Sequence, residues 1–101
     1  MKIEILEIAR KEFRIAKEFY ELEQSGLGAR FENEIKQALI RVLRYPTAWS
    51  LERKEIRRYF IHKFPYKILY SIQKEIIVVL AFAHLHRKPD YWINRTKFCA
   101  C

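Results

Sequence analysis

The sequence has very little glycine, proline or cysteine. Its 101 residues include only two glycines, three prolines and two cysteines. This composition excludes a disordered or low-complexity chain, and no internal repeat or Gly/Ser linker divides it. Both cysteines, Cys99 and Cys101, stand at the C-terminal end. Cysteines two residues apart seldom satisfy disulfide geometry, and the pair is a weak metal motif. We therefore expect no disulfide framework and no metal site.

The sequence also lacks a long apolar run. The longest covers residues 76–83, whereas a membrane-spanning helix needs about 20 apolar residues. The N-terminal residues carry charges every few positions and contain no apolar signal-peptide core. We expect a soluble, cytoplasmic protein with no membrane partner.

Known catalytic fingerprints are missing as well. The sequence contains no P-loop, nucleophile elbow, HExxH motif or Gly-rich dinucleotide motif. Metal-dependent phosphoryl transfer needs clustered carboxylates, and residues 51–101 hold only four, widely spaced. A chain this short does not build a large cofactor cleft alone, so we expect no cofactor. Any catalysis is then metal-free acid–base chemistry.

What the sequence does contain is enough apolar material for one core. Half of its residues are apolar and 15% are aromatic. Its length corresponds to a single domain covering residues 1–101. We expect residues 96–101 to form a flexible tail.

The first half of the sequence predicts a strand and two helices. Residues 2–6 alternate polar and apolar, as a short strand does. Residues 7–24 and 29–44 have apolar side chains at helical spacing, and residues 25–28, Ser-Gly-Leu-Gly, separate them. Pro46 ends the second helix. The short break predicts an antiparallel helical hairpin.

The second half predicts three strands. Residues 56–64 and 66–73 alternate with a period of two, and a turn at Pro65 separates them. Residues 76–83 are continuously apolar, which predicts the innermost strand, covered on both faces. The resulting order is β-α-α-β-β-β. We expect an α+β fold in which the hairpin packs on one face of a mostly antiparallel sheet.

The positive charge lies almost wholly in the second half. The chain has 20 Lys and Arg against 12 Asp and Glu, a net charge of +8. Residues 1–50 hold nine basic and eight acidic side chains, a net of +1, so residues 51–101 hold eleven and four, a net of +7. A basic surface favours anionic partners such as nucleic acid or an acidic protein.

Basic side chains alternate with aromatic ones in this half. This pattern suits a nucleic acid, whose phosphates pair with cations and whose bases stack on rings. It suits an acidic protein equally well, because Arg, Tyr and Trp dominate interface hot spots. The residues are Arg57, Arg58, His62, Lys63, Lys67, His84, His86, Arg87, Lys88, Tyr91, Trp92, Arg95 and Lys97.

A ribonuclease would need a base, an acid and cations beside the reacting phosphate. The histidines titrate in a useful range, and Arg87 is able to hold a phosphate with two hydrogen bonds. His84 directly follows the apolar strand, where a structural histidine is the commoner outcome. Tyr91 and Trp92 also fit a role in covering the end of the core.

Over nearly its whole length, including the helical hairpin and Pro46, the sequence resembles the RelE/ParE superfamily, the toxins of type II toxin–antitoxin modules. The resemblance rests on Arg57-Arg58, then Lys63-Phe64-Pro65-Tyr66 and Tyr70, then His84, Arg87-Lys88-Pro89, Trp92 and Arg95. It implies a growth-inhibiting toxin, of the kind associated with plasmid stabilisation. It also implies a small acidic antitoxin, whose disordered segment folds as it binds the toxin.

The superfamily has two branches, and the resemblance implies different roles in each. The ParE-like branch, which the long hairpin and the Phe-Pro-Tyr pattern favour, poisons DNA gyrase by binding. The residues expected to bind target or antitoxin are Arg57, Arg58, Lys63, Lys67, Arg87, Lys88, Trp92 and Arg95. The RelE-like branch cuts mRNA on the ribosome, and Arg58, His84, Arg87 and Tyr91 are then the catalytic candidates. A third possibility is a non-toxic, basic nucleic-acid-binding domain.

Overall fold

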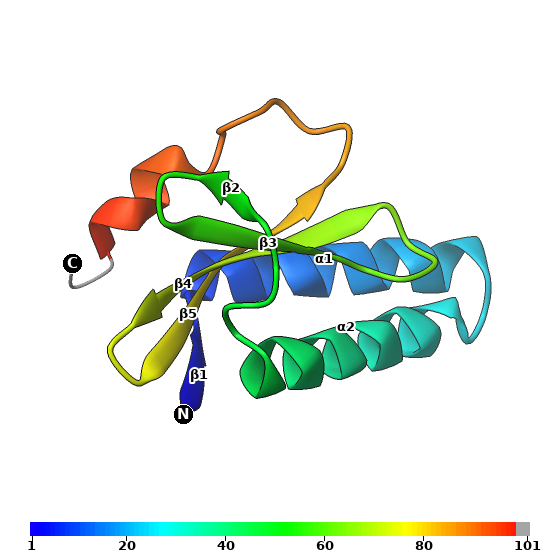
Figure 1. The fold of residues 1–101 in the computed structure, drawn as a ribbon. Coiled ribbons are helices and arrows are strands. Elements are labelled where there is room, and N and C mark those ends of the chain that lie inside the picture. Colours follow the sequence, from blue (N-terminus) through cyan, green and yellow to red (C-terminus); the bar gives the residue numbers. More distant parts are fainter. Residues whose placement is uncertain (99–101) are drawn as a thin grey trace.

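A five-stranded sheet forms the centre of the molecule, with two helices on one face and the C-terminal segment on the other (Figure 1). The computed structural model describes residues 1–98. The elements are β1 (Lys2–Ile5), α1 (Glu7–Glu23), α2 (Leu27–Arg44), β2 (Leu51–Arg53), β3 (Ile56–Phe60), β4 (Tyr66–Gln73), β5 (Ile76–His84) and the 3-10 helix η1 (Ile93–Phe98). The predicted α+β fold and element order are confirmed. The sequence did not indicate β2, because three residues are too few to show a period.

The sheet order is β1-β5-β4-β3-β2. β1 runs parallel to β5, and the other neighbours are antiparallel. The predicted innermost strand, β5, is therefore one place from the centre, which β4 occupies. The cause is that β1 pairs with the outer side of β5 and that β2 extends the opposite edge.

The helical hairpin turns where the sequence places its glycines. Gly26 has φ +90°, and α2 begins immediately after it, two residues earlier than predicted. The Glu21 carboxylate of α1 accepts hydrogen bonds from the backbone N–H groups of Gly26 (3.1 Å) and Gly28 (3.0 Å). These are donors that a helix leaves without an intrahelical partner, so Glu21 allows α2 to start early.

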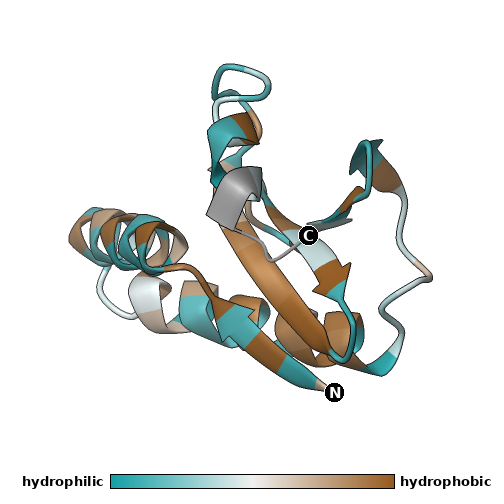
Figure 2. Ribbon diagram, turned by 90° about the vertical axis from the view of Figure 1, so that its left-hand side faces the viewer, coloured by the Kyte–Doolittle hydropathy of each residue, from teal (hydrophilic) through white to brown (hydrophobic). Residues whose placement is uncertain are grey.

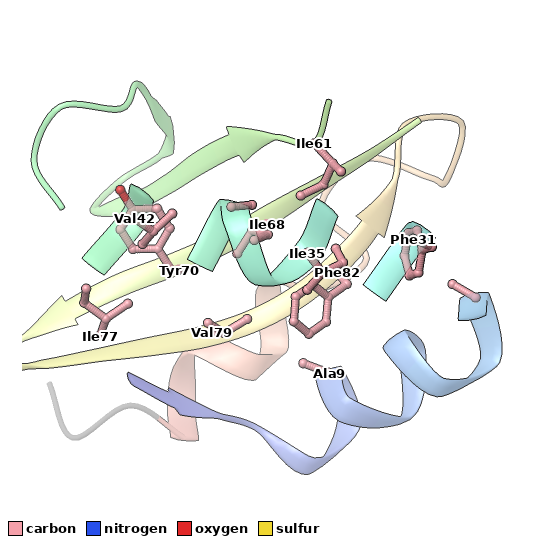
Figure 3. Close-up of a cluster of buried hydrophobic side chains, with 12 residues drawn as sticks. Ala9, Phe31, Ile35, Val42, Ile61, Ile68, Tyr70, Ile77, Val79 and Phe82 are labelled. Atoms are coloured by element: carbon pink, nitrogen blue, oxygen red, sulfur yellow. The ribbon is translucent and has the colours of Figure 1, made fainter. Parts of the chain in front are cut away.

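The larger core lies between the hairpin and the sheet (Figure 3). α1 contributes small residues, Ala9 and Ala16, which let the helix approach the sheet closely. α2 contributes large ones, including Phe31, whose side chain is fully buried. Facing them from β4 and β5 are Ile68, Tyr70, Val79 and Phe82.

A second core covers the other face of the sheet. Trp92, 2% exposed, packs there against the outer-face residues of β3, β4 and β5, which are Ile56, Leu69, Val78, Leu80, Ala81 and Ala83. β5 is consequently buried on both faces from Ile77 to Ala83, as predicted. Figure 2 shows this strand as hydrophobic along most of its length.

The strand predicted for residues 56–64 is shorter in the structure. β3 ends at Phe60, and Ile61 is buried in the helix-side core. The backbone N–H of Ile61 still donates to the carbonyl of Tyr66 (2.9 Å). Lys63 has φ +72°, a left-handed conformation that a strand does not contain. The turn before Pro65 therefore starts four residues earlier than the alternation suggested.

The C-terminal segment continues as ordered backbone beyond the sheet. Residues 96–98 of the predicted flexible tail form the end of η1, and residues 99–101, with Cys99 and Cys101, lie outside the described residues. None of the described helices is both long and apolar enough to cross a membrane. Within residues 1–98, no three His, Cys, Asp or Glu side chains are grouped so as to hold a metal ion.

Candidate binding site on the outer face of the sheet

A buried ion pair fixes the C-terminal segment to α1. Arg95 and Glu12 form two parallel contacts, Nη1 to Oε1 at 2.9 Å and Nη2 to Oε2 at 3.0 Å. Their side chains are only 10% and 14% exposed. The Tyr91 hydroxyl donates to the same carboxylate at 2.7 Å. A carboxylate with this many donors orients both the ring and the guanidinium.

The same pair satisfies backbone groups at the edge of the sheet. β1 pairs with β5 only as far as Val79, so the groups of β5 beyond that point have no strand partner on this side. The N–H of Phe82 donates to Glu12 (3.1 Å), and the carbonyl of Leu80 accepts from Arg95 (3.0 Å). Buried backbone groups need hydrogen-bond partners. Beyond the end of β1, the side chains of Glu12 and Arg95 supply them in place of a neighbouring strand.

The segment so anchored forms one wall of a small cleft, which we call the basic cleft. It encloses about 140 Å³ between the ends of β4 and β5, β2 and the loop of residues 85–92. Its charged and titratable lining residues are Glu52, Lys67, His84, Arg87, Lys88, Asp90 and Tyr91. Arg58 of β3 adjoins it through Glu52, which is 3.4 Å from the guanidinium.

Two carboxylates neutralise part of the positive charge at the basic cleft. Glu52 accepts from Lys67 (2.8 Å) as well as from Arg58, and Asp90 pairs with Arg53. Arg87 and Lys88 are exposed and have no carboxylate partner among residues 1–98. These two cations are therefore the ones available to an anionic ligand.

Arg87 is held in place by an aromatic ring, and no carboxylate neutralises its charge. Its guanidinium carbon lies 4.1 Å from the centre of the Tyr91 ring, and that of Arg95 lies 5.0 Å from the same ring. Such cation–π contacts orient a guanidinium while leaving its N–H groups free to donate. Burial, and then the hydrogen bond to Glu12, raise the pKa of Tyr91 well above its ordinary value. Tyr91 therefore keeps its proton to a higher pH than an exposed tyrosine does.

The histidine at the end of β5 is also engaged within the chain. Nδ1 of His84 accepts from the backbone N–H of His86 (3.0 Å), and its ring packs edge-on against Tyr66. His86 is exposed, 5.3 Å from the His84 ring. The basic cleft thus presents cations, while Tyr91 and one nitrogen of His84 are already committed to internal hydrogen bonds. This arrangement suits the binding of anionic groups better than proton transfer.

The structure separates the residues that the sequence grouped as candidates. Arg58, Lys67, His84, Arg87, Lys88 and Tyr91 meet at the basic cleft. Arg57 lies on the other face of β3, where it donates to the carbonyl of Trp49 (2.6 Å). Lys63 lies in the β3–β4 turn, beside a hollow lined by Tyr20 and Arg30.

Two expected binding residues are not on the surface. Trp92 and Arg95 are 2% and 8% exposed, so in this structure they contact the core and Glu12 instead of a ligand. The reason is that the segment folds back over the outer face of the sheet, which spacing along the chain did not reveal. Arg95 holds Tyr91 through the shared Glu12 carboxylate and through its contact with the Tyr91 ring.

Sequence reasoning missed the carboxylates that organise the site, Glu12, Glu52 and Asp90. A signal existed for Glu12, because it stands three residues after Ala9 and four before Ala16, on the side of α1 next to the core. No comparable signal existed for Glu52, because β2 was not predicted, or for Asp90, which has φ +61° in an irregular loop.

A second concave surface, which we call the helix groove, lies between α1 and α2. It encloses about 340 Å³, and its apolar floor is formed by Ile5, Phe13, Ile35, Leu39 and Phe82. Its charged rim consists of Arg10, Arg14, Lys36 and Glu32. Lys17 and Lys36 pair with Glu32 and lower its pKa. The rim is thus basic overall around an apolar floor.

A family model matches the sequence, and solved structures match the fold. A family model described as the ParE toxin of the type II toxin–antitoxin system parDE matches residues 3–89. A chain from the chromosomal ParDE system of P. aeruginosa superposes with a TM-score of 0.64 and 10% identity, over 85% of this chain and 97% of that one. The isolated E. coli RelE toxin superposes with a TM-score of 0.61 and 20% identity, over 95% and 96%. No curated protein sequence matches the chain.

Proposed function

The chain belongs to the ParE toxin family of type II toxin–antitoxin systems, and we propose that it inhibits growth by binding DNA gyrase in the cytoplasm until a small acidic antitoxin neutralises it. The resemblance to the RelE/ParE superfamily is confirmed by the family match over residues 3–89 and by the two similar folds. The growth inhibition, the cytoplasmic location, the gyrase target and the antitoxin are the proposed part.

The observation that carries the proposal is the state of the basic cleft. Arg87 and Lys88 are exposed cations, while the Tyr91 hydroxyl donates a hydrogen bond to Glu12 and Nδ1 of His84 accepts one from the backbone N–H of His86. A binding surface needs only the exposed cations, whereas a nuclease also needs an acid and a base that are free to transfer protons. Binding through Arg87 and Lys88, with Arg58 and Lys67 beside them, is therefore favoured over cleavage.

The proposed antitoxin fits the helix groove and the basic cleft. An amphipathic acidic segment would place apolar side chains on the floor formed by Phe13, Leu39 and Phe82. Its carboxylates would reach Arg10 and Arg14 on the rim. Coupled folding lets a short disordered segment cover two separate surfaces in this way.

A pair of reconstituted reactions tests the target directly. The purified chain is added in equal amounts to gyrase with relaxed plasmid and to ribosomes carrying mRNA. We expect loss of supercoiling by gyrase and intact mRNA. Arg87→Glu should abolish the loss, whereas Lys74→Asn, at the opposite end of β4 and β5, should not. Cut mRNA with active gyrase would contradict the proposal.

The antitoxin has its own test. A short acidic reading frame adjacent to the gene is expressed together with the toxin, and growth is followed. Rescue of growth, together with copurification of the two chains, is the expected result. Failure of every adjacent frame to rescue would remove the antitoxin from the proposal and leave the gyrase result standing.

One observation favours cleavage of ribosome-bound mRNA as the second candidate. His86 and Arg87 are adjacent, exposed and next to the basic cleft, which is a possible base and phosphate ligand pair. In that case His86→Ala and Arg87→Ala would each stop mRNA cutting without unfolding the chain. If neither reaction responds and expression is harmless, the chain is a basic nucleic-acid-binding domain, with binding that weakens steeply as salt rises.

A further inference from the structure

α1 carries a row of large apolar side chains that nothing in the chain covers. Ile8, Ile15, Phe19 and Leu22 are 48%, 59%, 54% and 81% exposed. Their spacing of seven, four and three residues places them along one side of the helix. We call this row the α1 stripe. Exposed apolar rows of this size on a small protein mark interaction surfaces.

The α1 stripe is separate from the helix groove. α1 faces the sheet through Ala9 and Ala16, and it faces α2 through Lys17, which pairs with Glu32. The helix groove uses Phe13 and Arg14 of α1, which lie on other sides of the helix from Ile15. A partner on the α1 stripe therefore leaves the helix groove and the basic cleft accessible.

The charges beside the α1 stripe are complementary to those of a second, antiparallel copy of α1. Lys11 and Glu18 flank the same side of the stripe, seven residues apart, and neither forms an ion pair within residues 1–98. When a second α1 is laid antiparallel, with a two-fold axis at Ile15, residue n faces residue 30 − n to within a turn. Ile8 then faces Leu22, and Ile15 faces its own copy.

The same two-fold axis places Lys11 of each copy next to Glu18 of the other copy, so that two equivalent ion pairs form. Self-complementary pairing of this kind is what a two-fold interface requires. We propose that the α1 stripe docks a second copy of this chain, helix to helix and antiparallel, with two Lys11–Glu18 ion pairs beside an apolar seam. The basic clefts of the two copies remain free for the target.

The charges beside the α1 stripe do not favour an acidic partner there. Glu18 and Glu23 are exposed on the last turns of α1 next to the stripe and repel an acidic segment. α1 as a whole holds four basic and five acidic side chains, unlike the strongly basic second half of the chain. A single helix pair also lies at the small end of interface sizes, so we expect weak, concentration-dependent dimers.

Charge reversal tests the pairing in solution. Sedimentation equilibrium of the full-length chain is measured across concentrations up to about 1 mM, a range suited to a small interface. Lys11→Glu and Glu18→Lys should each weaken dimerisation about tenfold or more, because each creates two like-charge contacts. The double variant Lys11→Glu/Glu18→Lys should restore it, because both pairs re-form with reversed polarity. Additive losses in the double variant would overturn the antiparallel register.

Cross-linking gives a second test that does not depend on affinity. In a Cys99→Ser/Cys101→Ser background, Ile15→Cys lies on the proposed two-fold axis and should oxidise to a disulfide-linked dimer. Gln37→Cys, exposed on α2, is the matched control and should stay monomeric. A monomer at every concentration, together with equal oxidation of the two variants, would show that a second copy does not occupy the α1 stripe. Unchanged thermal unfolding confirms that each variant is folded.

Discussion

Arg95 and Glu12, 83 positions apart, form a two-contact ion pair that joins the last described helix to the first one. Both side chains are nearly buried, and each also satisfies a backbone group of β5. The pair therefore does three things at once: it closes the edge of the sheet beyond β1, holds Tyr91, and fixes the wall of the basic cleft.

Breaking this pair should destabilise the protein strongly. Glu12→Gln leaves the Arg95 guanidinium buried without a counter-charge, which we expect to lower the free energy of unfolding by about 3 kcal/mol. Urea denaturation measures the change. Glu23→Gln, an exposed site on the same helix, should change it by less than about 0.5 kcal/mol. The double variant Glu12→Gln/Arg95→Gln should recover part of the loss, because no unpaired charge remains and the two amides can still pair with the backbone groups of Phe82 and Leu80. An equal effect of Glu12→Gln and Glu23→Gln would show that the pair contributes nothing.

Tyr70 should make stability fall at high pH. Its buried hydroxyl donates to the carbonyl of Pro46 (2.7 Å), and burial raises its pKa from the ordinary 10.0 to about 12. The unfolded chain loses this proton above pH 10, while the folded chain keeps it until about pH 12. The contribution is thus fully present below pH 10 and is lost as pH rises through this window.

The matched variant isolates that contribution. Tyr70→Phe cannot ionise, and it leaves the Pro46 carbonyl without its donor, so it should be less stable than the unmodified chain at pH 7 by about 1 kcal/mol. Denaturation at intervals from pH 8 to pH 11 should show the difference shrinking above pH 10. A difference that stays constant across this range would contradict the raised pKa.

Gly28 should not tolerate even one added carbon. A Cβ there would lie 2.9 Å from the carbonyl oxygen of Lys17 and 3.0 Å from Glu21. Alanine normally favours a helix over glycine by about 1 kcal/mol. Here we expect Gly28→Ala to lower the free energy of unfolding by about 1–3 kcal/mol, because a backbone oxygen cannot move aside easily. Ala29→Gly reports the ordinary propensity effect next to it. A stabilised Gly28→Ala would show that the helices separate freely.

Charges at the basic cleft should control the affinity for polyanions. On a heparin column, Arg87→Ala should elute at lower salt, because it removes a cation without a carboxylate partner. Glu52→Gln should elute at higher salt, because it frees Lys67 and Arg58 from their shared carboxylate. Lys74→Asn removes an equal charge at the far end of the sheet, so it reports the effect of net charge alone. Equal shifts for Arg87→Ala and Lys74→Asn would mean that the cleft has no local role.

Periodicity predicted most of the fold, because period and composition are local properties. The helical hairpin, β4 and the doubly buried β5 follow from spacing and from Gly26 and Pro46. The end of β3 was predicted wrongly because alternation continues past Phe60, although Lys63 turns the backbone. β2 was missed because a three-residue strand exists only through its pairing with β3.

The sequence predicted only some of the residues that lie together at the basic cleft. Arg58, Lys67, Arg87 and Lys88 do gather on one face, because they alternate along neighbouring strands or follow them directly. Trp92 and Arg95 are buried, because the C-terminal segment folds back onto the sheet.

The sequence alone determined that this is a basic α+β fold of the toxin family with its charge in the second half, since those properties depend on composition and short-range pattern. Only the tertiary structure decided which charges remain available to a partner. That depends on contacts such as Glu12 with Arg95 and Glu52 with Lys67, which join residues far apart in the chain and neutralise some cations while leaving Arg87 and Lys88 exposed.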